Sequence, residues 1–452
     1  MAGIKSPSKV DHLCVLVHGL WGNPSHLDYM AAVLKERYGE DHLHVLCPET
    51  NSGNFTYDGI EVGGERVVNE VEETLEKLEK EGQKITKISI VGYSLGGLVA
   101  RYAIGLLHAH GWLDKVQPMN FTTFASPHVG VRTPSKGLGG HIWNGLGPRM
   151  VSMSGQQLFM VDSFRQTGRP LLSILADPES IFIQGLKRFQ NRSVYGNIVN
   201  DRTTSFYTTL FMKKDPFQDL ENININYVDG YEQVIIDPDE HLLPRPPKEP
   251  ETCSETWVRY KATAQNIPFY LLVMVLLPPA VMAFIVNSGV QTFRSQKRIR
   301  LHLEGKNGKL FGKYKVPLLV QDVQCAMDEA VEGANARQEP EYLSSSDLET
   351  GDSLKKTTTR SLKSTESDSA LPPYEGESSA THNLMSGFPT LALTPDQFDI
   401  IDSLNEVGFK KYPVYIHNHR HSHAAIVVRI QKDDFNEGKL VMKHWLDNRF
   451  AV

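Results

Sequence analysis

A serine at a predicted strand–turn–helix junction is the feature that most limits how this chain can fold. A predicted strand from Ile85 to Val91 leads directly into the motif Gly92-Tyr93-Ser94-Leu95-Gly96-Gly97, and a helical pattern follows from Leu95 to His108. Flanking glycines allow the sharp turn that exposes a nucleophilic serine, and the helix N-terminus below it favours a developing oxyanion. A GxSxG string alone is a weak indication, because it arises by chance. In this context it predicts that Ser94 is a catalytic nucleophile.

The pattern around this junction predicts an α/β fold with a mostly parallel sheet. Short β-branched runs alternate with helical stretches up to about Thr208, and strands that are apolar throughout are typical of sheets covered on both faces. Strands are expected at 13–17, 42–46, 85–91, 121–125 and 193–199, and helices at 25–38, 59–80 and 95–108. After residue 390 we expect a helix at 391–405 and a strand at 414–416.

The loop that follows the first strand has the sequence His18-Gly19-Leu20-Trp21-Gly22. A serine hydrolase needs a second backbone donor opposite the serine turn, and lipases place it after an HG pair. We therefore assign the oxyanion hole to the backbone amides of Leu20 and Leu95. For His18 we expect a supporting role in the loop.

An acid and a base should follow Ser94 in the chain, in that order. Asp201, where the chain leaves the predicted strand 193–199, is the candidate acid, and an ordinary turn aspartate is the alternative. His423 is the candidate base because it precedes the apolar run AAIVV, which would anchor it on the core. His421 and His241 remain alternative bases. The cluster HNHRHSH resembles a metal site, but it has no acidic or cysteine companions in the sequence, and we expect neither metal nor cofactor.

Charge and cysteine content restrict the function classes. The net charge is −6, so we expect no nucleic-acid partner, because no excess of positive charge is available to displace counterions. The four cysteines are scattered, which predicts free thiols in a reducing compartment. The first twenty residues lack the pattern of a secretory signal, which predicts cytosolic synthesis.

A membrane-associating segment is predicted at 267–286, because these twenty residues carry no charge and a basic cluster follows at 294–300. A single crossing would place Ser94 and His423 on opposite sides of the bilayer. Either His241 is then the base, or the segment enters and leaves by one face. Pro278-Pro279 at its midpoint favours a bend into two arms, each only about 15 Å long. Such an anchor suits the monolayer of a lipid droplet, and it predicts a location on the cytosolic face of lipid droplets or of the endoplasmic reticulum.

The rest of the chain divides by composition. We expect a first part of the hydrolase core at 1–240 with a lid-like insertion at about 130–189, an insertion at 241–333, a disordered linker at 334–388 and a C-terminal part of the core at 389–452. The linker is rich in serine, threonine and charge, which cannot build a core. Within it, Leu371 to Tyr374 fits a weak WW-domain ligand motif, for which a solvated linker is the simpler interpretation.

Six motifs together resemble the serine esterase (lipase-like) family of α/β-hydrolases, which includes a fungal lipid-droplet phospholipase. They are HGLWGNPSHL, GYSLGGLVARYA, FASPHVG, the stretch from FMVDS to RPLLSIL, YGNIVNDRT and HSHAAIVVR. The resemblance covers roughly 10–235 and 390–450. It implies an α/β-hydrolase fold and hydrolysis of phospholipid esters, and it supports His423 as the base, because the family histidine precedes a similar apolar strand. A mono- or triacylglycerol lipase, a general esterase and a non-catalytic membrane adaptor are the alternatives.

Overall fold

The computed structural model describes residues 10–134, 138–165, 167–201, 203–218, 220, 224–239, 242–243, 286–302, 304, 341–343 and 388–452. The predicted membrane-associating segment up to residue 285, the WW-domain motif and His241 lie outside these residues, as does most of the predicted linker. Within the described ranges, no helix combines the length and the apolar composition needed to cross a bilayer.

A six-stranded sheet forms the centre of the molecule, and all of its strand pairs are parallel, as the sequence predicts. Its strand order is β2-β1-β3-β4-β5-β8. These strands are β1 (His12–Val17), β2 (Leu43–Leu46), β3 (Lys87–Tyr93), β4 (Gln117–Phe124), β5 (Asn191–Asn197) and β8 (Lys410–Val414). A separate antiparallel pair joins β6 (Asn224–Ile225) and β7 (Leu242–Leu243).

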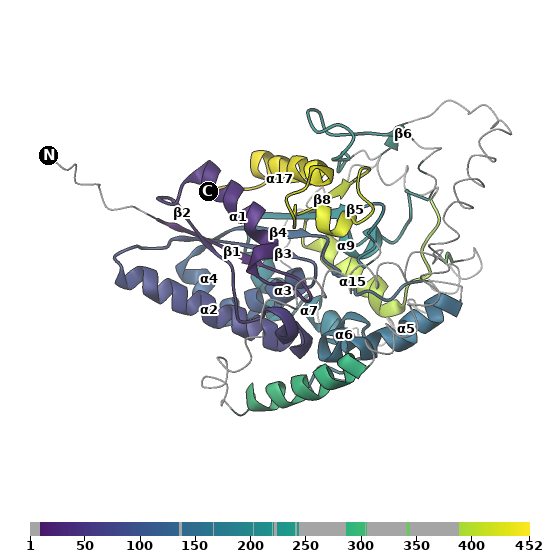
Figure 1. The fold of residues 1–452 in the computed structure, drawn as a ribbon, viewed down its shortest axis with the longest axis horizontal. Helices are drawn as coiled ribbons and strands as arrows, with labels where there is room; N and C mark the ends of the chain where they lie inside the picture. The colour runs from purple at the N-terminus through teal and green to yellow at the C-terminus, as the bar shows by residue number, and fades with distance from the viewer. Residues whose placement is uncertain are drawn as a thin grey trace, which may run out of the picture.

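Helices cover both faces of the sheet. On β1, Leu13 and Val15 belong to one hydrophobic core, whereas Cys14 and Leu16 belong to the other. Because successive strand residues point to opposite faces, a run that is apolar at every position must be buried on both sides. Figure 1 shows α17 (Asn436–Asn448) on one side of the sheet and α2 (Ile60–Lys80) on the other.

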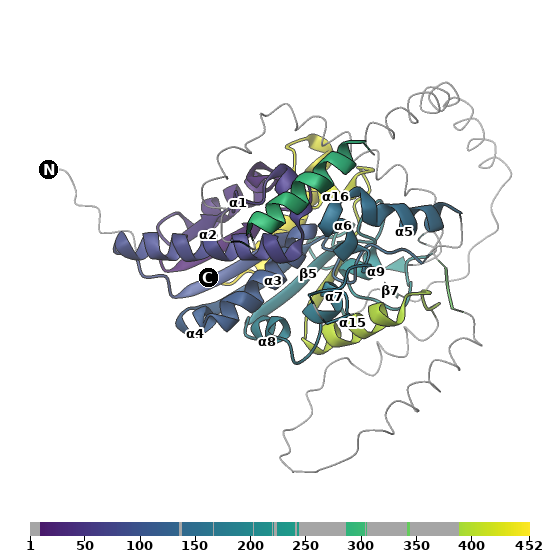
Figure 2. The same ribbon diagram turned by 90° about the horizontal axis from the view of Figure 1, so that it is seen from below.

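The remaining helices include those predicted at 25–38, 95–108 and 391–405, together with several short ones that were not predicted. Up to β4 they are α1 (Asp28–Tyr38), α3 (Leu95–Ala109) and α4 (Trp112–Lys115), with 3-10 turns at η1 (Pro24–Leu27) and η2 (Gly53–Asp58). Later helices are α9 (Phe206–Thr209), α15 (Pro395–Glu406) and α16 (Ser422–Ala425), followed by the turn η6 (Asp433–Phe435). One further helix, called helix 286–302 below, lies on the outside of the molecule on the same side as α2 (Figures 1 and 2).

The last strand of the sheet is shifted from its predicted position. A strand was expected at 414–416, whereas β8 spans Lys410–Val414. Its two lysines and Pro413 give it the composition of a loop. These residues are tolerated because β8 is the last strand in the order, where β5 is its one strand partner and its other side is met only by an isolated bridge between Val414 and Ile235. An edge strand can accept a proline and exposed lysines that a central strand cannot.

The predicted lid-like insertion contains four helices with two kinds of surroundings. Residues of α5 (Leu138–Met150) and α6 (Ser152–Leu158) line the pocket described below. Buried side chains of α7 (Leu171–Leu175) and α8 (Ile181–Lys187) belong to the main core and do not line this pocket, whereas Leu158 of α6 belongs to both. Only α5 and α6 are therefore placed to act as a lid, and this role stays a prediction.

Buried histidines make the fold sensitive to acid. Burial, as the largest cause, lowers the pKa values of His12, His18 and His444 from 6.5 to about 4. Between pH 4 and pH 6.5 the unfolded chain therefore binds more protons than the folded chain. The stabilisation is fully present above pH 6.5 and is lost as the pH falls toward 4. We expect a loss of up to about 3 kcal/mol for each histidine, measured as the free energy of unfolding in urea at several pH values. His444→Gln should lower the slope of this dependence, and a wild-type stability that is flat from pH 7 to 4 would contradict the assignment.

Candidate active site

Ser94 stands on a sharp turn between β3 and α3. Its φ of 55° and ψ of −130° lie in a region that a residue with a side chain rarely adopts. The turn is possible because the neighbouring glycines allow close backbone contacts. A Cβ atom added at Gly96 would lie 2.1 Å from the carbonyl oxygen of Val17, and one at Gly92 would lie 2.4 Å from the Cα atom of Gly97. The two glycines are therefore required by packing.

The three residues predicted as nucleophile, acid and base lie together at the carboxyl ends of the strands. The Oγ atom of Ser94 is 3.0 Å from Nε2 of His423, and Nδ1 of His423 is 2.8 Å from Oδ2 of Asp201. These are hydrogen-bond distances, and the imidazole uses both of its nitrogens. The structure thus brings His423, rather than His421, to Ser94. His241 lies outside the described residues.

Asp201 is held in its ionised form by the groups around it. Burial alone would raise the pKa of its carboxyl, but the charge and the hydrogen bond of His423 outweigh that effect and the pKa is lowered. Asn197 also donates to Oδ2 at 3.0 Å. The backbone amide of Thr204 donates to Oδ1 at 2.8 Å, and its hydroxyl lies 2.9 Å from Oδ2. A buried carboxylate with several donors is well suited to fix the tautomer of a histidine.

His423 is anchored differently from the way the sequence suggested. The run AAIVV was interpreted as an apolar strand, but α16 spans Ser422–Ala425 and places His423 within a helical turn. The anchoring effect is nevertheless present, because Ala425, Ile426 and Val427 are fully buried. In addition, the hydroxyl of Tyr93, next to Ser94, donates to the carbonyl oxygen of His423 at 3.0 Å.

The loop after β1 lies directly against Ser94. A Cβ atom at Gly19 would lie 2.6 Å from the Cβ atom of Ser94, so a larger residue would displace the serine. Burial lowers the pKa of His18 to about 4, so its ring is neutral, and Nδ1–H donates to the carbonyl oxygen of Gly19 at 3.1 Å. Leu20 and Leu95, the predicted oxyanion donors, both line the pocket that contains Ser94.

A mainly apolar pocket opens above Ser94 and His423. Its empty volume, open mouth included, is about 860 Å³. Most of its wall comes from apolar side chains of the loop after β1 and of the α5–α6 region: Leu20, Trp21, Val131, Trp143, Val151, Leu158 and Phe159. A pocket of this apolar character can hold an apolar part of a substrate next to the reacting groups.

Several residues of the site were not predicted from the sequence. Thr204 hydrogen bonds Asp201 and lies 3.1 Å from Nδ1 of His423, and Asn197 supports the same carboxylate. The only sequence signal for Thr204 is its place in the turn that follows Asp201. Arg429 lines the pocket, but no local pattern distinguishes it from the other arginines of the chain.

A parallel sheet with helices on both faces, a serine turn after β3, and an acid and a histidine after later strands define an α/β-hydrolase. In agreement with this class, residues 7–215 match the sequence model of a family described as "Putative serine esterase (DUF676)". This match confirms, over residues 7–215, the resemblance to a serine esterase family seen in the motifs.

Known proteins similar to this chain are described as lipases and esterases. "Putative lipase ROG1" of Saccharomyces cerevisiae is 33% identical over 226 residues, which cover 49% of this chain and 31% of that protein. A protein of Schizosaccharomyces pombe, also described as a "Putative lipase", is 29% identical over 45% of this chain and 26% of its own length. The chain spans about a third of the length of the curated relatives it matches. Among solved structures, carboxyl esterase 2 of Tuber melanosporum aligns with 15% identity and a TM-score of 0.28, over 43% of this chain and 59% of its own.

Proposed function

We propose that this chain hydrolyses acyl esters of phospholipids at a lipid surface through an acyl-enzyme on Ser94. The Oγ atom of Ser94 attacks the ester carbonyl carbon while His423 takes the hydroxyl proton at Nε2. Backbone amides of Leu20 and Leu95 hold the oxyanion, and His423 returns the proton to the departing alcohol. Water, activated by the same histidine, then releases the fatty acid. Asp201 keeps the imidazole in the required tautomer and stabilises its charged form.

The single observation that carries this proposal is the continuous set of short contacts from Ser94 through His423 to Asp201, at 3.0 Å and 2.8 Å. These groups come from three separate parts of the sheet. Their mutual orientation is the one that nucleophilic catalysis requires. A non-catalytic protein that kept only the fold would not need this orientation. The apolar pocket beside them supports a substrate with a long acyl chain.

Arg429 supports phospholipids over neutral acylglycerols. Among the described residues that line the pocket, it is the only one with a permanent charge. A guanidinium binds a phosphate with paired charge-assisted hydrogen bonds, whereas a triacylglycerol offers it no anionic group. An arginine beside the reacting groups therefore favours an ester whose alcohol part carries a phosphate.

The proposed location is the cytosolic face of lipid droplets or of the endoplasmic reticulum. Ser94 and His423 precede and follow the uncharged segment 267–286 in the chain, yet they must meet on one side of the membrane. With His423 as the base, the segment would therefore enter and leave by the same face. The monolayer of a lipid droplet suits such an anchor, because it has no second aqueous side.

The substrate class is tested by fatty-acid release from separate phospholipid and triacylglycerol emulsions. For Arg429→Gln we expect kcat/KM on phospholipid to fall by about 10- to 100-fold, because one charged hydrogen-bond donor is lost, with little change on triacylglycerol. The exposed Arg420, in the loop just before α16, provides the matched control Arg420→Gln. An equal loss on both emulsions would remove the argument for phosphate recognition, and no release from either by the wild type would contradict the proposed function.

A further inference from the structure

Helix 286–302 turns polar residues toward the protein and leaves three apolar side chains exposed on its mixed outward side. The side that faces the protein carries Ser288, Gln291, Ser295 and Arg298, all of which are buried. The outward side carries Val286, Val290 and Phe293, which are 63%, 44% and 73% exposed. A helix on the surface of a soluble protein buries its apolar stripe and exposes its polar one. This arrangement indicates that the outward side is suited to a non-aqueous medium.

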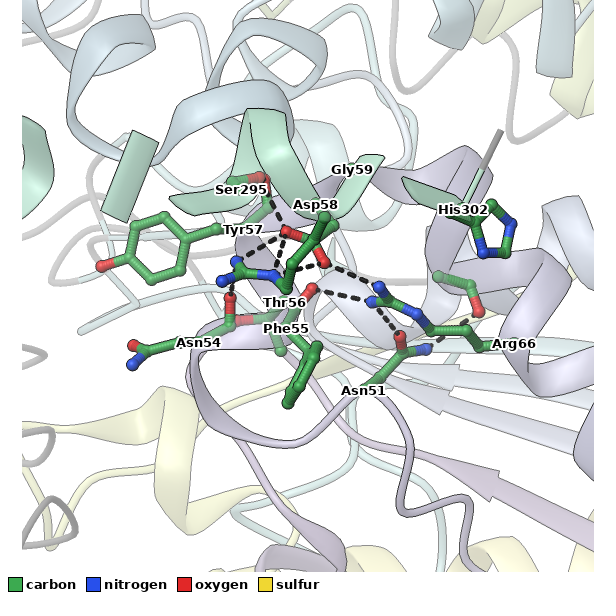
Figure 3. Close-up of polar contacts among 12 residues, drawn as sticks. Asn51, Asn54, Phe55, Thr56, Tyr57, Asp58, Gly59, Arg66, Ser295 and His302 are labelled. Atoms are coloured by element: carbon green, nitrogen blue, oxygen red, sulfur yellow. Dashed lines mark hydrogen bonds and ion pairs between the residues drawn. The ribbon is translucent and has the colours of Figure 1, made fainter. Parts of the chain in front are cut away.

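The inward side is held by a buried charge cluster, made of Asp58, Arg66, Ser295 and Arg298. Figure 3 labels the first three of these residues. The Asp58 carboxylate accepts from Arg298, with Nη2 2.7 Å from Oδ1 and Nε 2.9 Å from Oδ2. Arg66 Nη2 and the Ser295 hydroxyl each lie 2.7 Å from the same carboxylate. Two guanidiniums and a hydroxyl thus share one buried acid, and partners this specific fix the rotation of the helix about its axis.

The same cluster connects the helix to the wall of the active-site pocket. Asp58 ends η2, and Thr56 of that turn accepts from the backbone amide of Trp21, a pocket residue next to Leu20, at 3.0 Å. At the other end of the helix, the Ser288 hydroxyl donates to the carbonyl oxygen of Arg149 on α5, the helix that carries Trp143. The outward side of helix 286–302 is therefore held in a set position relative to the pocket.

Two features of the chain indicate what covers this side. The uncharged segment 267–286, predicted from its sequence to associate with a membrane, directly precedes the helix in the chain. Beside the exposed apolar residues, Arg294, Lys297 and Arg300 add positive charge, although Arg300 also lies 3.9 Å from Glu304. Apolar side chains flanked by cations are typical of helices that lie in the interface of an anionic membrane.

We propose that the outward side of helix 286–302 docks on an anionic lipid surface, and that the Asp58 cluster holds this side rigidly beside the active-site pocket. The docking rests on the proposed function, because it places the pocket of a lipid hydrolase next to its substrate layer. It extends that function by assigning contact with lipid to described residues outside the pocket.

The position of the helix is tested without turnover, in the full-length Ser94→Ala protein bound to vesicles of phosphatidylcholine and phosphatidylserine. Tryptophan placed by Phe293→Trp should be quenched by brominated acyl chains more strongly than the tryptophans of the parent protein. The matched control is Ile181→Trp, because Ile181 is 38% exposed at the start of α8 and lies outside the proposed surface. No additional quenching for Phe293→Trp would overturn the proposal, and the helix would then be covered by another part of the chain or by a second copy.

Activity then separates docking from chemistry. Val290→Asp should reduce hydrolysis of anionic vesicles by about tenfold or more, because a charged side chain is driven out of the apolar layer. Hydrolysis of a soluble short-chain ester should stay within about twofold, since the pocket residues are unchanged. Equal rates of vesicle hydrolysis for Val290→Asp and the wild type would overturn the docking surface. A wild-type protein that binds vesicles but hydrolyses neither substrate would contradict the proposed function and leave the docking surface standing. The two results are separable because the quenching experiment needs no activity.

Discussion

Replacing Ser94 by alanine is expected to lower kcat for ester hydrolysis by a factor on the order of 10⁴ or more, because the nucleophile is lost and only oxyanion stabilisation and binding remain. The measurement is fatty-acid release under substrate saturation. Ser173→Ala is a suitable control, because Ser173 is buried and its hydroxyl has no hydrogen-bond partner among the described residues. Full activity in Ser94→Ala would exclude the proposed mechanism.

The base is tested by His423→Ala with His421→Ala as its neighbour control. We expect His423→Ala to lose about as much activity as Ser94→Ala, and the double variant to lose no more than either, because the two residues act as one unit. His421→Ala should keep most of its activity, since it is His423 that lies 3.0 Å from Ser94. An active His423→Ala protein would move the base to another histidine, with His241 first to be examined.

Asp58→Asn is expected to lower the free energy of unfolding by about 3–5 kcal/mol, because two buried guanidiniums lose their shared countercharge. The side chain of Asp58 is fully buried, and those of Arg66 and Arg298 are only 3% and 6% exposed. Urea unfolding at pH 7 measures the change. The control is Glu40→Gln, which removes the exposed pair of Lys35 and Glu40 and should cost less than about 1 kcal/mol.

Arg298→Met is a second test of the same charge cluster. On its own it should destabilise the protein less than Asp58→Asn, because Asp58 keeps Arg66 at 2.7 Å. Added to Asp58→Asn, it should recover part of the lost stability, because it removes one of the two uncompensated charges. Destabilisation by Asp58→Asn no larger than that of Glu40→Gln would show that the cluster does not hold helix 286–302 in place.

Much of the sheet was predictable from local sequence. The run Leu13 to Val17 is apolar at every position, which only strands buried on both faces require. The edge strand β8 was misplaced because Lys410, Lys411 and Pro413 follow the rules for an exposed edge, which the sequence pattern does not distinguish from a loop. The division of the 130–189 region into pocket wall and core was also missed, because both parts consist of short amphipathic helices.

The site was predictable to the extent that each residue has a local signature. Ser94 has its turn of glycines and His18 has the neighbouring HG loop. Asp201 was chosen for its place after a predicted strand and His423 for the apolar run that follows it, both in the expected chain order. Thr204 and Arg429 have no such signature. Their contribution depends on where the turn after Asp201 and the bend after α16 bring them, and one sequence carries no direct record of such contacts.

By itself, the sequence determined the α/β class and the serine turn. Both depend on local patterns, because the hydrophobic periodicity of an element and the glycines of a turn involve residues only a few positions apart. Tertiary structure decided which histidine meets Ser94, and it decided that helix 286–302 turns its polar side inward. Asp58 and Arg298 are 240 residues apart in the chain. The attraction between their charges depends on distance in space and on burial, so only the folded chain could show that they pair.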